Sequence, residues 1–137
     1  MKKNISILLF VLIGVIMLIM CVSCKGVNDI YIDKKSSYFS DYIVKNDKVY
    51  IRCYITLTNT FETEKSVTLS AKLPEDVRTG LLKNETVKAL DEKGEEIIFV
   101  LPPNTSESLE VIFVGDYAGF MQKNNRNLPE ICIKMVE

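Results

Sequence analysis

Histidine and tryptophan are absent from this chain of 137 residues. Without imidazole the chain cannot form a Ser-His-Asp triad, a Cys-His pair, or a zinc or non-haem iron site that needs histidine. An excess of charge of one sign is also lacking, because 17 basic and 18 acidic residues give a formal net charge of -1. That balance excludes a nucleic-acid binder that works through a basic surface. Hydrophobic residues make up 47% of the chain, which is too many for an intrinsically disordered protein.

Catalytic and metal-binding patterns are also scarce. The glycines stand too far apart to form a phosphate-binding loop. The acidic pairs Glu75-Asp76, Asp91-Glu92 and Glu95-Glu96 are adjacent in the sequence, which predicts solvated turn charges rather than two carboxyls that face each other across a cleft. Asn28-Asp29 and the segment Asp91–Gly94 match a calcium-binding loop only loosely. The sequence therefore predicts a protein that is not an enzyme, with no catalytic residue, cofactor or metal site.

The N-terminal segment is the most informative part of the chain. Lys2 and Lys3 supply a positive start, and Ile5 to Met20 is apolar apart from Ser6 and a central glycine. This run is long for the core of a signal peptide and slightly short for a membrane span, which takes about 20 apolar residues. The residues that follow the run decide between these two interpretations.

Val22-Ser23-Cys24 resembles a lipobox, the cleavage site of bacterial lipoproteins, although Cys21 stands where a lipobox usually has leucine. The resemblance implies that residues 1–23 are a signal peptide and that Cys24 receives a diacylglycerol on its sulfur. Two or more acyl chains anchor a protein stably, so the implied partner is the membrane, through Cys24. The implied location is the cell membrane, with the domain on the extracytoplasmic side. The alternative is an uncleaved helical anchor in the same orientation.

Residues 24–37 are predicted to form the lipid-anchored tether, with one short strand at Asp29–Asp33, and residues 38–137 to form a single domain. Without Lys2 and Lys3, 15 of the 17 basic residues remain beside 18 acidic ones, so this domain is mildly acidic. Its hydrophobic residues recur at every second position, which is the period of a half-buried strand. The helical period is nowhere convincing.

Seven or eight short strands follow from this alternation and from the turn residues between its segments. We expect them at Tyr42–Val44, Val49–Thr58, Ser66–Leu73, Glu85–Leu90, Glu96–Leu101, Ser108–Val114 and Glu130–Val136. The pattern is typical of an antiparallel, immunoglobulin-like β-sandwich, and in general outline it resembles the small immunoglobulin-like modules of bacterial surface lipoproteins. A small closed barrel is the main alternative, because the number of strands does not separate the two.

Cys53 and Cys132 are the two cysteines left to form a disulfide in the mature domain. An exported domain permits such a bridge. Cys53 lies on the apolar face of its predicted strand, whereas Cys132 falls opposite Ile131 and Ile133, and a bridge needs side chains that converge. We expect Cys53 to be a buried thiol, and the bridge remains open, since a β-bulge could turn one of the two residues.

The loop at Gly115–Pro129 is the best candidate for a binding element, because long loops in compact domains are often functional. It mixes aromatic, methionine and basic residues, which are enriched at interfaces. The candidate partner-binding residues are Tyr117, Phe120, Lys123 and Arg126. The alternative is an Ω-type loop that packs Phe120 and Leu128 onto the domain. Tyr50, Arg52 and Tyr54 form a stripe on the longest strand that is either a binding surface or, preferably, an aromatic cover of the sheet.

The predicted function is that of a lipid-anchored, non-enzymatic protein of the cell envelope that presents a β-sandwich to an unknown protein or envelope partner. The alternative is a small-solute or cation-binding accessory protein of an envelope transport system. A nucleic-acid partner is not expected. The sequence does not identify the partner.

Overall fold

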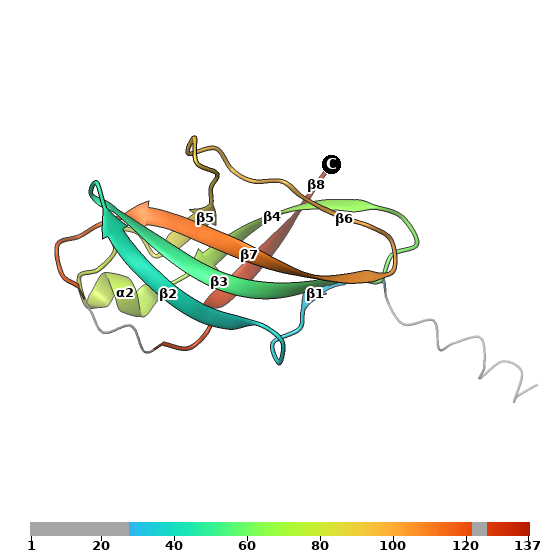
Figure 1. The fold of residues 1–137 in the computed structure, drawn as a ribbon, viewed down its shortest axis with the longest axis horizontal. Coiled ribbons are helices and arrows are strands. Elements are labelled where there is room, and N and C mark those ends of the chain that lie inside the picture. The colour runs from blue at the N-terminus through green and yellow to red at the C-terminus, as the bar shows by residue number, and fades with distance from the viewer. Residues whose placement is uncertain (1–27, 122–125) are drawn as a thin grey trace, which may run out of the picture.

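A computed structural model of the chain describes residues 28–121 and 126–137. Within these ranges the chain forms eight antiparallel strands in one sheet that is nearly barrel-shaped (Figure 1). The elements are β1 (Ile30–Ile32), β2 (Tyr38–Lys45), β3 (Lys48–Asn59), β4 (Lys65–Lys72), helix α2 (Pro74–Arg78), β5 (Thr86–Ala89), β6 (Phe99–Leu101), β7 (Thr105–Asp116) and β8 (Glu130–Val136).

The long strand β3 organises one half of the sheet. β7 pairs with β3 along its whole length, from Lys48 opposite Asp116 to Asn59 opposite Thr105. The other side of β3 pairs with β2 over its first half and with β1 over its last three residues. The predicted hairpin at Lys45–Lys48 is present. Asn46 and Asp47 have φ values of 52° and 59°, which is the left-handed conformation that a two-residue hairpin turn requires.

The second half of the sheet is built on β4. β8 pairs with one side of β4, while β5 and β6 share the other side. Among the described strands, the two halves pair with each other only where Lys88 and Ala89 of β5 lie opposite Val114 and Phe113 of β7. All eight strands thus belong to one hydrogen-bonded sheet, with β1 and β2 at one edge and β8 at the other. The prediction of an all-β, antiparallel fold is confirmed. The immunoglobulin-like sandwich is not confirmed, because the number of strands does not reveal that β5 and β7 pair and join the two halves into one sheet.

The core lies inside the curled sheet and consists of alternate residues of its strands. Val49, Ile51, Cys53, Ile55 and Leu57 of β3 are completely buried. Twelve further buried residues, from the other strands and from the turn after α2, complete it: Ile30, Tyr42, Val67, Leu69, Ala71, Leu81, Leu82, Val87, Ala89, Leu101, Val111 and Phe113. The period-two pattern therefore identified the inward face of β3 correctly.

The two ends of the barrel carry different segments. Ile30 of β1 pairs with Asn59, at the C-terminal end of β3, so the chain enters the barrel at that end. The β2–β3 turn, α2 and the start of the segment after β7 lie at the opposite end (Figure 1). The strand found at Ile30–Ile32 within the predicted tether shows that the sheet already begins there.

The predicted signal peptide or anchor helix and Cys24 lie outside the described residues. No helix in residues 28–121 and 126–137 has the length and apolar character needed to cross a membrane.

Candidate functional site

The late loop, which we define as residues 117–129 between β7 and β8, begins on well-fixed backbone. The Tyr117 N–H donates to the Asp47 carbonyl in the β2–β3 turn, over 2.9 Å. The Ala118 N–H donates to the Leu81 carbonyl, and the Phe120 N–H donates to the Gly80 carbonyl. Gly80 has φ +86°, so the chain can turn sharply after α2 and meet the loop. The first four residues of the late loop are therefore held against two other segments.

A buried ion pair holds the late loop at a second point. Arg126 Nη1 lies 2.5 Å from Asp76 Oδ2, and the two side chains are only 13% and 6% exposed. The guanidinium carbon of Arg126 also lies 5.0 Å from the ring centroid of Tyr42, in cation–π geometry. Asp76 belongs to α2, and its carbonyl accepts the N–H groups of Leu81 and Leu82. This cluster therefore joins α2, β2 and the late loop.

The three predicted binding residues that the structure describes do not share one open surface. Tyr117 is half-buried and packs against the core, and Arg126 forms the buried ion pair with Asp76. Phe120 is 61% exposed. Lys123 lies outside the described residues. Leu128 packs against the core as the Ω-loop alternative expects, but Phe120 does not.

Three exposed hydrophobic side chains of α2 and the late loop lie at this end of the barrel, and we call them the end patch: Val77, Phe120 and Met121. Phe120 and Met121 are each 61% exposed, and Val77 on α2 is 37% exposed. They are linked through Gly80, whose N–H donates to the Val77 carbonyl and whose carbonyl accepts from Phe120. The sequence analysis missed Val77, because this residue precedes the loop by some forty positions and carries no signal of its own.

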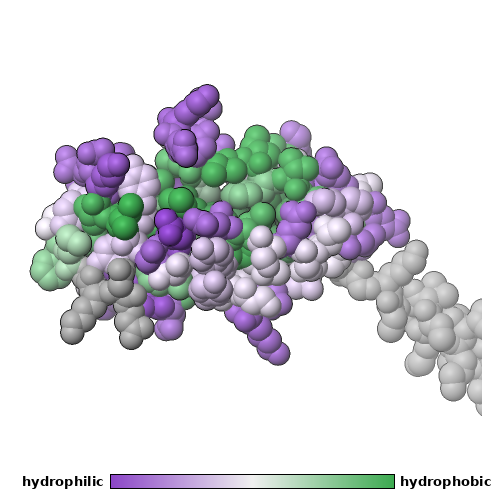
Figure 2. Space-filling view, viewed as in Figure 1, coloured by the Kyte–Doolittle hydropathy of each residue, from purple (hydrophilic) through white to green (hydrophobic). Residues whose placement is uncertain are grey.

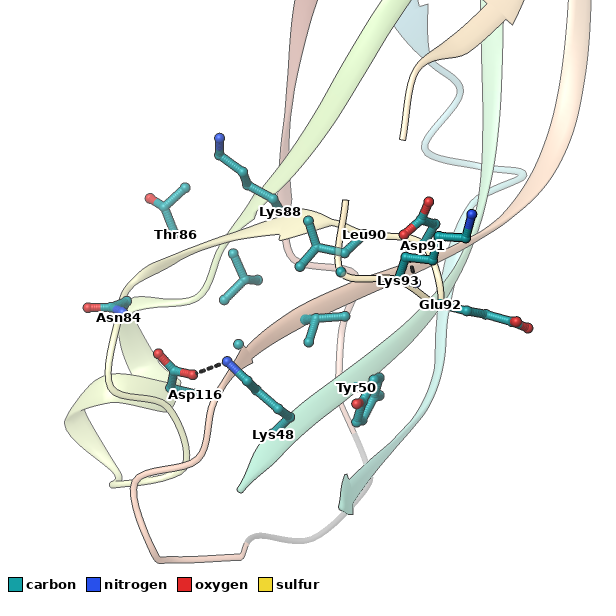
Figure 3. A pocket seen from close by; sticks show the side chains of 14 residues that line it. Lys48, Tyr50, Asn84, Thr86, Lys88, Leu90, Asp91, Glu92, Lys93 and Asp116 are labelled. Atoms are coloured by element: carbon teal, nitrogen blue, oxygen red, sulfur yellow. Dashed lines mark hydrogen bonds and ion pairs between the residues drawn. The ribbon is translucent and has the colours of Figure 1, made fainter. Parts of the chain in front are cut away.

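A groove of about 570 Å³ opens beside the same end, between the outer side of β3 and β7 and the turn that follows β5 (Figure 3). Val87, Leu90 and Val114 supply its apolar part. Its charged lining residues are balanced, with three lysines and three acids: Lys48, Lys88, Lys93, Asp91, Glu92 and Asp116.

Four of these six charged residues have a hydrogen-bond or ion-pair partner. Lys48 Nζ lies 2.5 Å from Asp116 Oδ1 (Figure 3), and this contact raises the pKa of Lys48 and lowers the pKa of Asp116. Lys88 Nζ lies 2.9 Å from Glu96 Oε2 and lowers the pKa of that carboxyl. The Asp91 carboxylate accepts two backbone N–H groups of its own turn. The groove can thus offer both signs of charge to a small polar molecule, but no general acid or base stands apart in it.

The predicted stripe on β3 is engaged with its neighbours. Arg52 Nε lies 3.1 Å from Glu110 Oε1, and Arg52 Nη1 lies 3.7 Å from Asp41 Oδ2. The ring of Tyr54 stacks on Tyr38, with 5.1 Å between the centroids. These cross-strand contacts are those of a cover on the outer face of β2, β3 and β7.

The structure has Cys53 and Cys132 as free thiols. Cys53 is completely buried in the core, and its burial raises the pKa of the thiol to about 12. A thiol with so high a pKa is not a nucleophile at neutral pH. Cys132 is half-buried on β8, directly opposite Ser70 of β4.

A second hydrophobic area lies over β6 in the view of Figure 2. The exposed hydrophobic side chains of this part of the sheet come from β6, the residue before it, and the end of β8: Ile98, Val100, Met135 and Val136. Thr68, Glu96 and Lys134 give it a polar surround. Exposed hydrophobic groups of this kind are common at contact surfaces.

Within the described part of the chain, no three His, Cys, Asp or Glu side chains lie close enough together to hold a metal ion. The chain matches no protein-family model, and no curated protein and no solved structure matches it significantly.

Proposed function

We propose that this chain is a lipid-anchored protein of the cell envelope, held at the membrane through Cys24, with a non-enzymatic β domain that binds another protein. The observation that carries the proposal is the end patch. An aromatic and a methionine side chain are exposed there on backbone that is already hydrogen-bonded to the α2 segment. Such residues are enriched at interfaces, and a surface that is ordered before binding loses less entropy on association.

The position of the end patch supports the proposal. The patch lies at the end of the barrel opposite to β1, where the chain comes from Cys24 (Figure 1). A domain anchored through Cys24 therefore presents the patch away from its attachment point.

Two experiments test the two parts of the proposal. Mass spectrometry of the full chain extracted from its membrane should show a protein that begins at Cys24 and carries a diacylglycerol, and Cys24→Ala should lose the modification. An unmodified chain that retains Met1 contradicts the anchor.

The binding surface is tested by photo-cross-linking in intact cells. A photoreactive phenylalanine analogue replaces Phe120 in one variant and Ile43, which is 54% exposed on β2, in the control. A defined adduct is expected at position 120 and not at position 43, and Val77→Asp should abolish it. Equal labelling at both positions, or no adduct at 120, contradicts the end patch as a binding surface.

The groove of Figure 3 favours a second candidate, an accessory protein that binds a small solute. Its volume of about 570 Å³ lies within the usual range for ligand pockets, and its balanced charges suit a zwitterion such as an amino acid. An amino acid at 100 times its dissociation constant should stabilise the protein by about 2.7 kcal/mol. The absence of any shift in Tm across the free amino acids would count against this candidate.

A further inference from the structure

Strand β8 leaves one of its sides open. Its other side pairs with β4 from Glu130 opposite Lys72 to Val136 opposite Ser66, and no other described strand pairs with it. The open side faces a groove of about 690 Å³, which separates β8 from β1 at the other edge of the sheet. An edge strand of this kind presents unpaired N–H and C=O groups to any strand that approaches it.

The alternation of β8 gives it two different faces. Ile131 and Ile133 point to the core side, where they are half-buried and line the groove. Glu130, Cys132 and Lys134 therefore share the outer face, since successive side chains of a strand point to opposite sides. The acid lies two residues before Cys132 and the lysine two residues after it, and neither forms an ion pair with another described residue.

We propose that β8 pairs with β8 of a second copy of this chain, antiparallel and about a twofold axis at Cys132. In this register Glu130 faces Lys134 of the second copy, Ile131 faces Ile133, and Cys132 faces its own equivalent. Opposite charges placed directly across an antiparallel pair stabilise it. The four half-buried isoleucines of the two strands lie together on the core side of the pair, where they line the groove beside β8.

The charges favour this register over its neighbours. A shift by two residues in either direction loses both Glu130–Lys134 pairs, and a shift by four residues places Lys134 opposite Lys134 or Glu130 opposite Glu130. Like charges directly opposite each other are unfavourable. A register offset by one residue brings the isoleucines of one copy to the outer face, where they are exposed to water. The pattern around Cys132 is therefore complementary to itself in one register.

The thiols provide a direct test in membranes of cells that express the full chain. Facing residues of an antiparallel pair have Cα atoms about 4.5–5.5 Å apart, within the range that a disulfide spans. The oxidant diamide, which takes two electrons and two protons from a pair of thiols, should convert the chain into a reducible species of twice its mass. Peptide mapping should find Cys132 linked to Cys132. Cys132→Ser should abolish this species, whereas Cys53→Ser, at a buried site, should retain it.

Charge reversal tests the register itself. Lys134→Glu or Glu130→Lys alone should raise the dimer dissociation constant roughly tenfold, because each creates two like-charge pairs across the axis. The double variant with both substitutions should return it to the wild-type value, which also shows that the strand still folds. Lys45→Glu, the same charge change at an exposed position of β2, should leave it unchanged. Sedimentation of the full chain in detergent measures these constants.

A monomeric wild-type chain, a dimer without the Cys132 link, or single variants that associate as well as wild type would each overturn the proposal. The pairing uses neither Cys24 nor the end patch, so its failure and the failure of the proposed function are distinguishable.

Discussion

Replacing Arg126 with alanine should destabilise the protein far more than its place in a surface loop suggests. The substitution leaves the carboxylate of Asp76, whose side chain is 6% exposed, without the guanidinium 2.5 Å away. Removal of one partner of a buried ion pair costs about 3–5 kcal/mol, because the other charge stays buried without compensation. The Arg126 side chain keeps 13% of its exposure, so we expect the lower end of that range, about 3 kcal/mol.

The assay is urea unfolding of the full chain in detergent, followed by circular dichroism. A loss of about 3 kcal/mol should also lower Tm by roughly 12 °C in a domain of this size. Arg78→Ala is the matched control, since Arg78 also pairs with an acid of α2 but its side chain is 74% exposed. An exposed pair contributes only about 0–1 kcal/mol. Equal losses for the two arginine variants would refute the reasoning, because the buried Arg126–Asp76 pair and the exposed Arg78–Glu75 pair should differ in cost.

Three further predictions follow from the core and the groove. In the folded chain at pH 8, N-ethylmaleimide should modify Cys132 and leave Cys53 unmodified, because burial raises the pKa of the Cys53 thiol to about 12. Modification of Cys53, detected by mass spectrometry, would contradict this prediction. The pKa of Asp116 is lowered from its ordinary 3.8, so its contribution to stability is complete above about pH 4 and is lost as the pH falls through the folded value. Asp116→Asn should therefore lower stability at pH 7 and not at the acid end, and a difference that persists at low pH would contradict this. Gly115→Ala should cost about 1–3 kcal/mol in urea unfolding, since the added Cβ would lie 2.6 Å from Val87 Cγ1, and an unchanged midpoint would show that the site can expand.

The strands were predictable because their signals are local. The β2–β3 hairpin depends on Asn46 and Asp47, which tolerate a left-handed turn, and the structure has both at positive φ. Glu130–Val136 is found with the predicted bounds, since its alternation and the preceding proline are visible in the sequence. The single, nearly barrel-shaped sheet was not predictable, because its two halves are joined by pairings between β5 and β7 that no short-range pattern encodes.

The candidate site was predicted only in part, for the same reason. Arg126 reads as a free basic residue until the fold brings Asp76, fifty positions earlier, against it. Asn59 directly follows the predicted strand Val49–Thr58 and reads as an ordinary turn residue, yet it is buried and its amide donates to the carbonyls of Leu101 and Pro102, more than forty positions later. In both cases the partner is remote in the sequence, so the residue type alone gives no information about its surroundings.

The start of β1 at Ile30 limits how far the domain can extend from a bilayer. Six residue steps separate Cys24 from Ile30, and a fully extended chain covers about 20 Å over that length. Strand β3, with 12 residues, spans about 40 Å along the barrel toward the opposite end. With the anchor at Cys24, Phe120 and Met121 therefore lie no more than roughly 60 Å from the lipid headgroups, and a partner that binds them must come within that distance of the membrane.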